Sequence, residues 1–124
     1  MAESVIVAAL LRGKPGKEDE LAGRLHALVQ ASRLDPGVTT YNLHRSIEDP
    51  ASWFLYERYE SHEHLNRHLQ NAILRGFLAE AATLVDGNVD IRTFRMVNEL
   101  PAREGPGSQS IEGANNASRE NPRY

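Results

Sequence analysis

The hydrophobic residues in the first third of the chain follow two different patterns. Residues 5–11 (VIVAALL) form a short continuous apolar run, which is typical of a strand buried on both faces. Between residues 17 and 34 the apolar positions recur at spacings of three and four, at Leu21, Leu25, Leu28 and Val29. Acidic residues at 18–20 favour the positive end of a helix dipole. The pattern therefore predicts a strand followed by an amphipathic helix.

A pair of strands is predicted next. Asp35-Pro36-Gly37 ends the helix, because proline cannot continue it and glycine supplies a turn. Residues 38–47 (VTTYNLHRSI) alternate in part between two faces. After a second turn at residues 48–50, residues 53–59 (WFLYERY) are rich in aromatic side chains that favour strands. The two segments together predict a hairpin.

Helical spacing then returns before a last strand. Ser61 is a suitable N-cap, and the helix that it begins continues through Leu69. Residues 72–85 carry apolar side chains at helical spacing, whereas residues 89–97 alternate as a strand. The order β-α-β-β-α-β is that of the ferredoxin-like split βαβ arrangement, so the predicted fold class is α+β with an antiparallel sheet.

The composition changes at residue 98. The segment NELPAREGPGSQSIEGANNASRENPRY is dominated by Gly, Pro, Ser, Asn and charged residues, with almost no apolar side chain. A segment of this kind cannot bury enough apolar surface to fold by itself. We therefore predict one domain over residues 1–97 and a polar C-terminal tail over residues 98–124.

The predicted sheet has two apolar faces but only one layer of helices. Residues 53–59 would place Trp53 and Leu55 on one face and Phe54 and Tyr56 on the other. An exposed apolar patch of that size normally marks an interface. The pattern predicts a homodimer whose two sheets face each other and form a shared α/β barrel.

Composition and charge exclude several classes of function. The 124 residues include no cysteine, which excludes disulfides, thiolate nucleophiles and iron–sulfur clusters and fits a reducing cytoplasm. The 14 Lys+Arg and 17 Asp+Glu are interspersed, for a net charge of -3, which argues against a nucleic-acid partner. The N-terminal apolar run is too short for a membrane span or a signal peptide. We expect a cytoplasmic protein with no membrane partner.

Candidate chemistry gathers in residues 56–69 (YERYESHEHLNRHL). His64 and His68 are four apart, as two metal ligands on one side of a helix would be. Leu65 and Leu69 define the buried side, however, so that His64 points away from it and His68 lies at its flank. We therefore expect no metal. His68 could reach a cleft and take a phenolic proton, or it could be a hydrogen-bonded structural histidine.

Glu57 lies in an otherwise apolar strand and shares a face with Tyr59. A carboxylate that faces a core costs several kcal/mol unless it is paired. It is either functional, as a pocket acid/base or an orienter of His68, or it is the partner of an arginine from a neighbouring strand, such as Arg45 or Arg92. Of the two, we favour the salt bridge.

Five other side chains are candidates for substrate binding. Asn42 and His44 share a strand face and could hydrogen-bond a carbonyl, or both could lie in the dimer interface, depending on the hairpin register. Trp53, Tyr59 and Phe77 could stack on a planar aromatic ring, or they could be plain core.

Several short motifs jointly resemble the antibiotic biosynthesis monooxygenase family, in particular its quinol-monooxygenase-like members. They stand here as Ala31-Ser32-Arg33, Asp35-Pro36-Gly37, Tyr41-Asn42-Leu43, Asp49-Pro50, Glu57 and Leu65-Asn66-Arg67-His68-Leu69. The resemblance spans residues 4–97. It implies a dimeric α/β barrel with a pocket between sheet and helices in each subunit. It also implies oxidation of a small quinol or polyphenol with O2, without flavin, metal or other cofactor.

Under this hypothesis His68 and Glu57 are the catalytic residues. Two features depart from the family pattern. Many quinol-type relatives have Thr-Pro-His after the Leu-x-x-His-Leu motif, where this chain has Asn71-Ala72-Ile73. The haem-degrading branch has an iron-binding histidine in the next helix, and residues 74–85 contain none, so haem is disfavoured.

Two other functions remain open because the fold does not determine the activity. One is a non-catalytic, ligand-binding or stress-related α/β-barrel protein. The other is an isomerase of a small phosphorylated sugar, which would need basic residues converging on the pocket. The candidates for such a cluster are Arg45, Arg58, Arg67 and Arg75.

Overall fold

The computed structural model describes residues 3–98, which form four strands and three helices. In chain order they are β1 (Val5–Arg12), α1 (Glu18–Ser32), β2 (Val38–Arg45), β3 (Ser52–Tyr59), α2 (His62–His68), α3 (Ala72–Leu84) and β4 (Asp90–Arg95). The strands lie in the order β2-β3-β1-β4, and all neighbours are antiparallel. This confirms the predicted ferredoxin-like α+β fold. The predicted tail beyond Asn98 lies outside the described residues.

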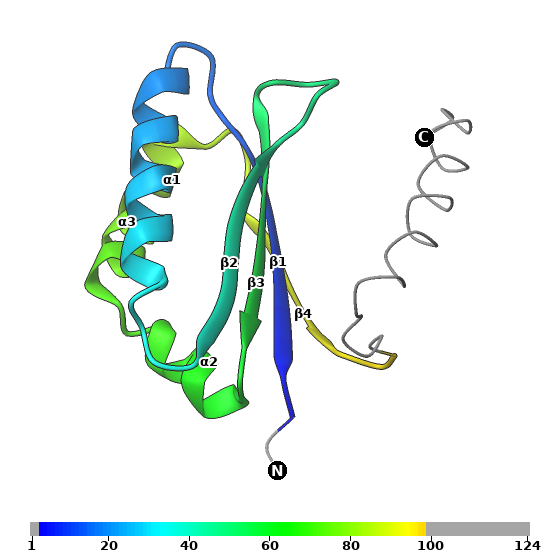
Figure 1. The fold of residues 1–124 in the computed structure, drawn as a ribbon. Helices are drawn as coiled ribbons and strands as arrows, with labels where there is room; N and C mark the ends of the chain where they lie inside the picture. Colours follow the sequence, from blue (N-terminus) through cyan, green and yellow to red (C-terminus); the bar gives the residue numbers. More distant parts are fainter. Residues whose placement is uncertain (1–2, 99–124) are drawn as a thin grey trace, which may run out of the picture.

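The molecule has two layers. Helices α1 and α3 lie along one face of the sheet, and the short helix α2 lies at the end of β3 (Figure 1). Within residues 3–98 no helix covers the opposite face, and β2 and β4 are the free edges of an open sheet. The shared barrel therefore stays a prediction about two chains. No helix in this part of the chain has the length and apolar character needed to cross a membrane.

The second helical region divides into two helices because each has its own N-cap. The Ser61 hydroxyl oxygen accepts a hydrogen bond from the backbone N–H of His64, 3.3 Å away. The Asn71 side-chain oxygen accepts from the backbone N–H of Ile73 at 2.8 Å and of Leu74 at 3.2 Å. Asn71 thus begins α3 three residues after α2 ends.

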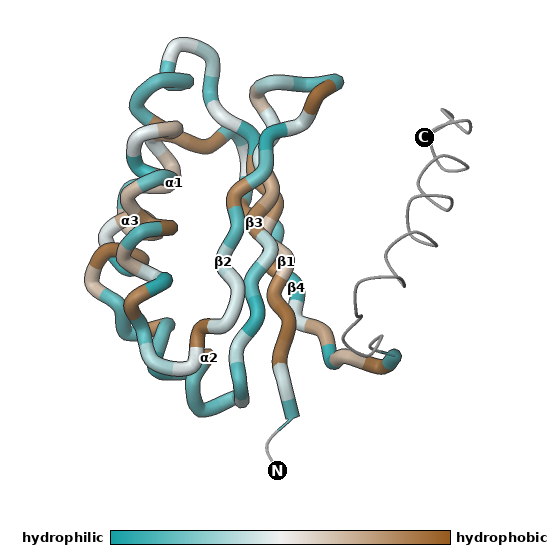
Figure 2. Tube along the Cα trace, in the orientation of Figure 1, coloured by the Kyte–Doolittle hydropathy of each residue, from teal (hydrophilic) through white to brown (hydrophobic). Residues whose placement is uncertain are grey.

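The core lies between the helices and the face of the sheet that they cover. Hydrophobic and hydrophilic positions alternate along the elements, as expected where each element buries one side (Figure 2). The buried side chains come from the sheet and from the two long helices, and include Ala9, Leu11, Leu55, Leu21, Leu25, Leu28, Phe77 and Leu84.

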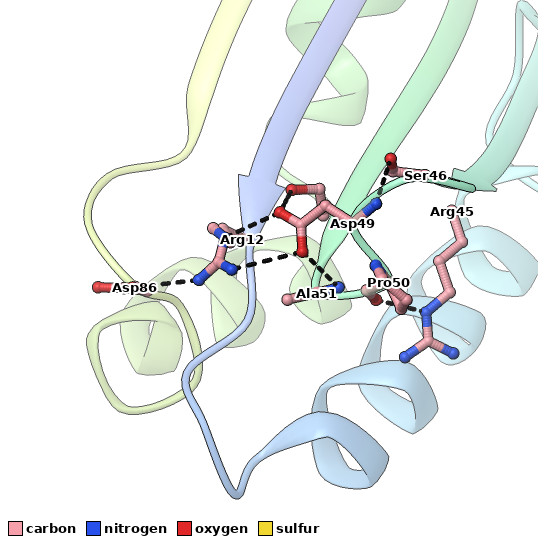
Figure 3. A network of polar contacts seen from close by, with 8 residues as sticks. Arg12, Arg45, Ser46, Asp49, Pro50, Ala51 and Asp86 are labelled. Carbon is pink, nitrogen blue, oxygen red and sulfur yellow. Dashed lines mark hydrogen bonds and ion pairs between the residues drawn. The ribbon is translucent and has the colours of Figure 1, made fainter.

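A surface network braces the end of the sheet farthest from α2 (Figure 3). The Arg12 Nε donates to Asp49 Oδ2 at 3.0 Å, and Arg12 Nη1 lies 3.6 Å from Asp86 Oδ2. Asp49 Oδ2 also accepts from the Ser52 hydroxyl at 2.8 Å. The guanidinium of Arg12 thereby lowers the pKa of Asp49. These contacts tie the β2–β3 turn to the turn before β4.

Candidate functional site

A cavity of about 150 Å³ lies between the sheet and the helices. Its apolar wall includes side chains from β1, α1, β3, α2, α3 and β4, among them Val7, Ala9, Leu11, Leu28, Leu55, Leu65, Leu74, Phe77 and Ile91. Its polar lining residues are Tyr41, Glu57, His68 and Thr93. Leu69, Leu78 and Ile91, which also line it, are about half exposed, so the cavity reaches the surface on their side.

Glu57 faces the helices because residues alternate along β3. Its side chain is buried, and its strand partners are Tyr41 on β2 and Val7 on β1. The Tyr59 hydroxyl donates to Glu57 Oε1 at 2.6 Å, and the Tyr41 hydroxyl is a second hydrogen-bond partner. Burial raises the pKa of Glu57 to about 7, although both tyrosine hydroxyls act to lower it.

The favoured salt bridge between Glu57 and an arginine is wrong. Arg45 lies over the ring of Trp53, 4.6 Å from the ring centroid, and donates to the carbonyl oxygen of Pro50. Arg92 pairs with Asp90 and, by alternation along β4, faces the uncovered side of the sheet. The donors to Glu57 are instead neutral hydroxyl groups, because burial raises the pKa of Tyr41 and of Tyr59 above the ordinary value for tyrosine.

His68 closes the same end of the cavity. It is the last residue of α2, its side chain is only 2% exposed, and its ring packs 5.4 Å from the ring centroids of Tyr41 and Tyr59. Its Nδ1 lies 3.0 Å from Asp35 Oδ2. Because a carboxylate can only accept, Nδ1 carries the proton in this contact, which leaves Nε2 of the neutral ring as an acceptor.

Asp35 was not expected to take part in the site. The sequence identifies it only as part of the turn after α1, 33 residues before His68. The same Oδ2 atom accepts from the Asn71 side-chain amide at 2.9 Å, so the residue that caps α3 also fixes the carboxylate. The left-handed backbone at Gly37 (φ 78°) completes the turn, and a side chain there would overlap the His64 ring. No local sequence signal pairs this turn with His68.

The structure brings together some of the predicted site residues and separates others. Glu57, His68 and Phe77 line the cavity, and Tyr59 holds Glu57. Trp53 is buried in the core but does not line the cavity.

Asn42 and His44 lie on the uncovered face of the sheet. The Asn42 side-chain oxygen accepts from Arg33 Nη2 at 3.0 Å, and the His44 ring stacks on Phe54 with centroids 5.2 Å apart. Neither residue lines the cavity.

The two helical histidines four residues apart make different contacts. His64 Nδ1 lies 2.8 Å from the Ser61 hydroxyl oxygen, whereas His68 contacts Asp35. Across residues 3–98, no group of three or more His, Cys, Asp or Glu side chains is placed to hold a metal ion.

Known proteins with similar sequences and structures agree with this architecture. A protein of Bacillus subtilis (strain 168) named "Putative monooxygenase YcnE" is 24% identical over 87 residues, which cover 70% of this chain and 92% of that protein. The crystal structure of PA3566 from Pseudomonas aeruginosa superposes with a TM-score of 0.73 at 26% identity, covering 79% of this chain and 98% of the other. Rv0793 from Mycobacterium tuberculosis gives a TM-score of 0.74 at 23% identity, with 79% and 99% covered.

The family model for antibiotic biosynthesis monooxygenases matches residues 4–80. The matched region contains Asp35, Glu57, Tyr59 and His68, and thus the polar end of the cavity. The chain belongs to the antibiotic biosynthesis monooxygenase family.

Proposed function

We propose that this protein is a cofactor-independent monooxygenase that oxidises a small quinol or polyphenol with O2. The observation that carries the proposal is the polar end of the cavity. A glutamate with a pKa of about 7 and a histidine aligned by Asp35 line one small apolar space. Membership of the family, and a relative named as a monooxygenase, support the same class of reaction.

In this proposal His68 is the first base. The Asp35 carboxylate keeps the Nδ1 proton in place and stabilises the imidazolium that forms when Nε2 accepts a phenolic proton. Glu57 is about half ionised at neutral pH and can accept a proton from a second hydroxyl. The Tyr59 hydroxyl fixes the carboxylate that receives it.

Deprotonation prepares the substrate for reaction with oxygen. The phenolate passes one electron to O2, and the resulting ring radical and superoxide combine to form a carbon–oxygen bond. Loss of water then leaves a hydroxyquinone. One oxygen atom replaces a ring hydrogen, the other leaves as water, and the substrate supplies every electron. The apolar inner wall of the cavity shields these intermediates from water on every side except the mouth.

Oxygen uptake by the chelator-treated protein tests the proposal. The panel should include dihydroxybenzenes, naphthoquinols and anthrones, with autoxidation subtracted for each compound. We expect saturable uptake that falls by at least about a hundredfold in His68→Ala. His62→Ala is the matched control, since His62 is an exposed histidine of the same helix. Uptake that never exceeds autoxidation, or that survives in His68→Ala, would contradict the proposed role.

The two other functions receive less support from the site. For the non-catalytic barrel protein we expect a filled core under Trp53 and Tyr59, whereas the cavity reaches His68, as catalysis requires. A phosphorylated sugar needs cations, but among the described residues no arginine or lysine lines the cavity.

We also propose that two chains pair through the uncovered face of the sheet. Leu10 and Phe94 are about half exposed there, next to the more buried Ile6 and the partly buried Phe54 and Tyr56. Contiguous apolar side chains of this kind normally mark an interface. Such pairing would leave the cavity free, because the cavity lies on the other side of the sheet.

A further inference from the structure

The cavity is polar at one end only. Tyr59 contacts both Glu57, through its hydroxyl at 2.6 Å, and His68, whose ring centroid is 5.4 Å from its own. Tyr41 likewise contacts both residues. The two groups that can accept a proton from a ligand therefore lie at the same end of the cavity. Thr93 on the edge strand β4 lies in the same cross-strand row as Glu57, because Val7 pairs with both. Beyond this row, the wall formed by Ala9, Phe77 and their neighbours is apolar.

The volume of the cavity sets the size of the ligand. A cavity of about 150 Å³ matches the engineered apolar cavities in other proteins that accept a single benzene ring. On the inner side, a second fused ring would have to displace Phe77 and Leu74, which are buried in the core. Close-packed core side chains resist such displacement. On the outer side it would lie in the open mouth beside Leu69, Leu78 and Ile91, where it stays in contact with solvent.

Size and polarity together define one class of ligand. We propose that the cavity selects a single-ring aromatic with two adjacent hydroxyl groups, a 1,2-dihydroxybenzene, which points both hydroxyls at Glu57 and His68. The inference rests on the proposed function, because it names the substrate class of the same site. The unsubstituted edge of the ring would pack against Phe77 and Ala9.

Adjacent hydroxyls match the acceptors that the site offers. The Glu57 carboxylate has about four lone-pair sites, of which the two tyrosine hydroxyls use two, and His68 Nε2 is a further acceptor. In a 1,4-dihydroxybenzene bound through one hydroxyl, the other hydroxyl points away from both acceptors, towards the apolar wall at Ala9 and Phe77. A buried hydroxyl without a partner weakens binding by roughly tenfold or more.

Calorimetric titration under nitrogen tests the selection without turnover. The probes are 1,2-dihydroxybenzene, 1,4-dihydroxybenzene, phenol and 2,3-dihydroxynaphthalene. We expect 1,2-dihydroxybenzene to bind at least about tenfold more tightly than each of the others. Equal or tighter binding of the 1,4-isomer or of the naphthalene, or no binding of 1,2-dihydroxybenzene, would overturn the inference.

A variant that fills the cavity and a matched surface control test where the ligand binds. Ala9→Leu should fill the apolar end of the cavity and abolish binding, whereas Ala79→Leu adds the same side chain at an exposed position of α3 and should leave binding unchanged. If Ala9→Leu does not fold, Glu57→Gln serves instead and should reduce the preference for the 1,2-isomer. Binding that is unaffected by these cavity variants would contradict the assignment. Selective binding of 1,2-dihydroxybenzene without oxygen uptake would overturn the proposed monooxygenase function but support the inferred class of ligand.

Discussion

Replacing Glu57 with glutamine should remove a pH dependence from the stability of the fold. Burial raises the pKa of this carboxyl from 4.5 to about 7. A carboxyl whose pKa is raised by folding adds stability that is complete below the unfolded pKa and is lost as the pH rises through the folded pKa. At about 1.4 kcal/mol for each pH unit, that loss amounts to about 3 kcal/mol between pH 4.5 and about 7.

Urea unfolding at pH 5 and pH 8 measures the effect. About 2.5 kcal/mol of the loss falls between these two values, because the unfolded carboxyl is already mostly ionised at pH 5. Glutamine keeps the shape of the side chain and an oxygen that accepts from Tyr59, but it does not titrate. The free energy of unfolding of the wild type minus that of Glu57→Gln should therefore be about 2.5 kcal/mol lower at pH 8 than at pH 5.

Comparing the two proteins at each pH cancels the titration of every other group. Glu60→Gln is the control, since Glu60 is an exposed glutamate three residues further along the chain, and it measures what the same substitution does outside the cavity. All samples need the same protein concentration in case the chain associates. A constant difference between wild type and Glu57→Gln at both pH values would show that Glu57 is already ionised at pH 5, which would refute the burial argument.

Three further predictions concern the turn and the open face of the sheet. Asp35→Ala should convert the His68 ring from the Nδ1–H to the Nε2–H tautomer, seen in its ¹⁵N shifts, and lower oxygen uptake, whereas Asp49→Ala should do neither. Gly37→Ala should cost about 1 kcal/mol more in thermal unfolding than Gly16→Ala, because both have positive φ but only Gly37 faces the His64 ring. Light scattering should show a dimer that Phe94→Glu dissociates and Ile47→Glu, in the exposed turn, does not.

Strand alternation made part of the site predictable. A period of two places Glu57 and Tyr59 on one face of β3, and it places Asn42 and Tyr41 on opposite faces of β2. The helix pattern likewise places His68 at the flank of the buried side, where it is found. Alternation does not determine which face of β2 the helices cover. The observed packing puts Tyr41 inside and Asn42 outside, away from the cavity.

Side-chain partners distant in sequence could not be predicted. Asp35 contacts His68 only because the turn after α1 packs against the end of α2. No sequence pattern near either residue predicts that contact. The prediction of an arginine partner for Glu57 was wrong for a related reason. Charge alone favours an arginine, but Arg45 lies beside Trp53 and Arg92 lies on the other face of the sheet. The hydrogen bonds to Glu57 come instead from Tyr41 and Tyr59.

The choice of partner decides what the buried carboxyl can do. An arginine would hold the pKa of Glu57 low and fix its charge, as in a structural ion pair. Tyrosine hydroxyls satisfy the oxygen atoms without supplying a positive charge, and burial then holds the pKa at about 7, where the group both gives and takes a proton. Near neutral pH this arrangement costs the fold about 3 kcal/mol, a substantial share of the roughly 5–15 kcal/mol that stabilises a typical domain. A leucine would avoid that cost, and so the carboxyl is better explained by proton transfer in the cavity than by stability.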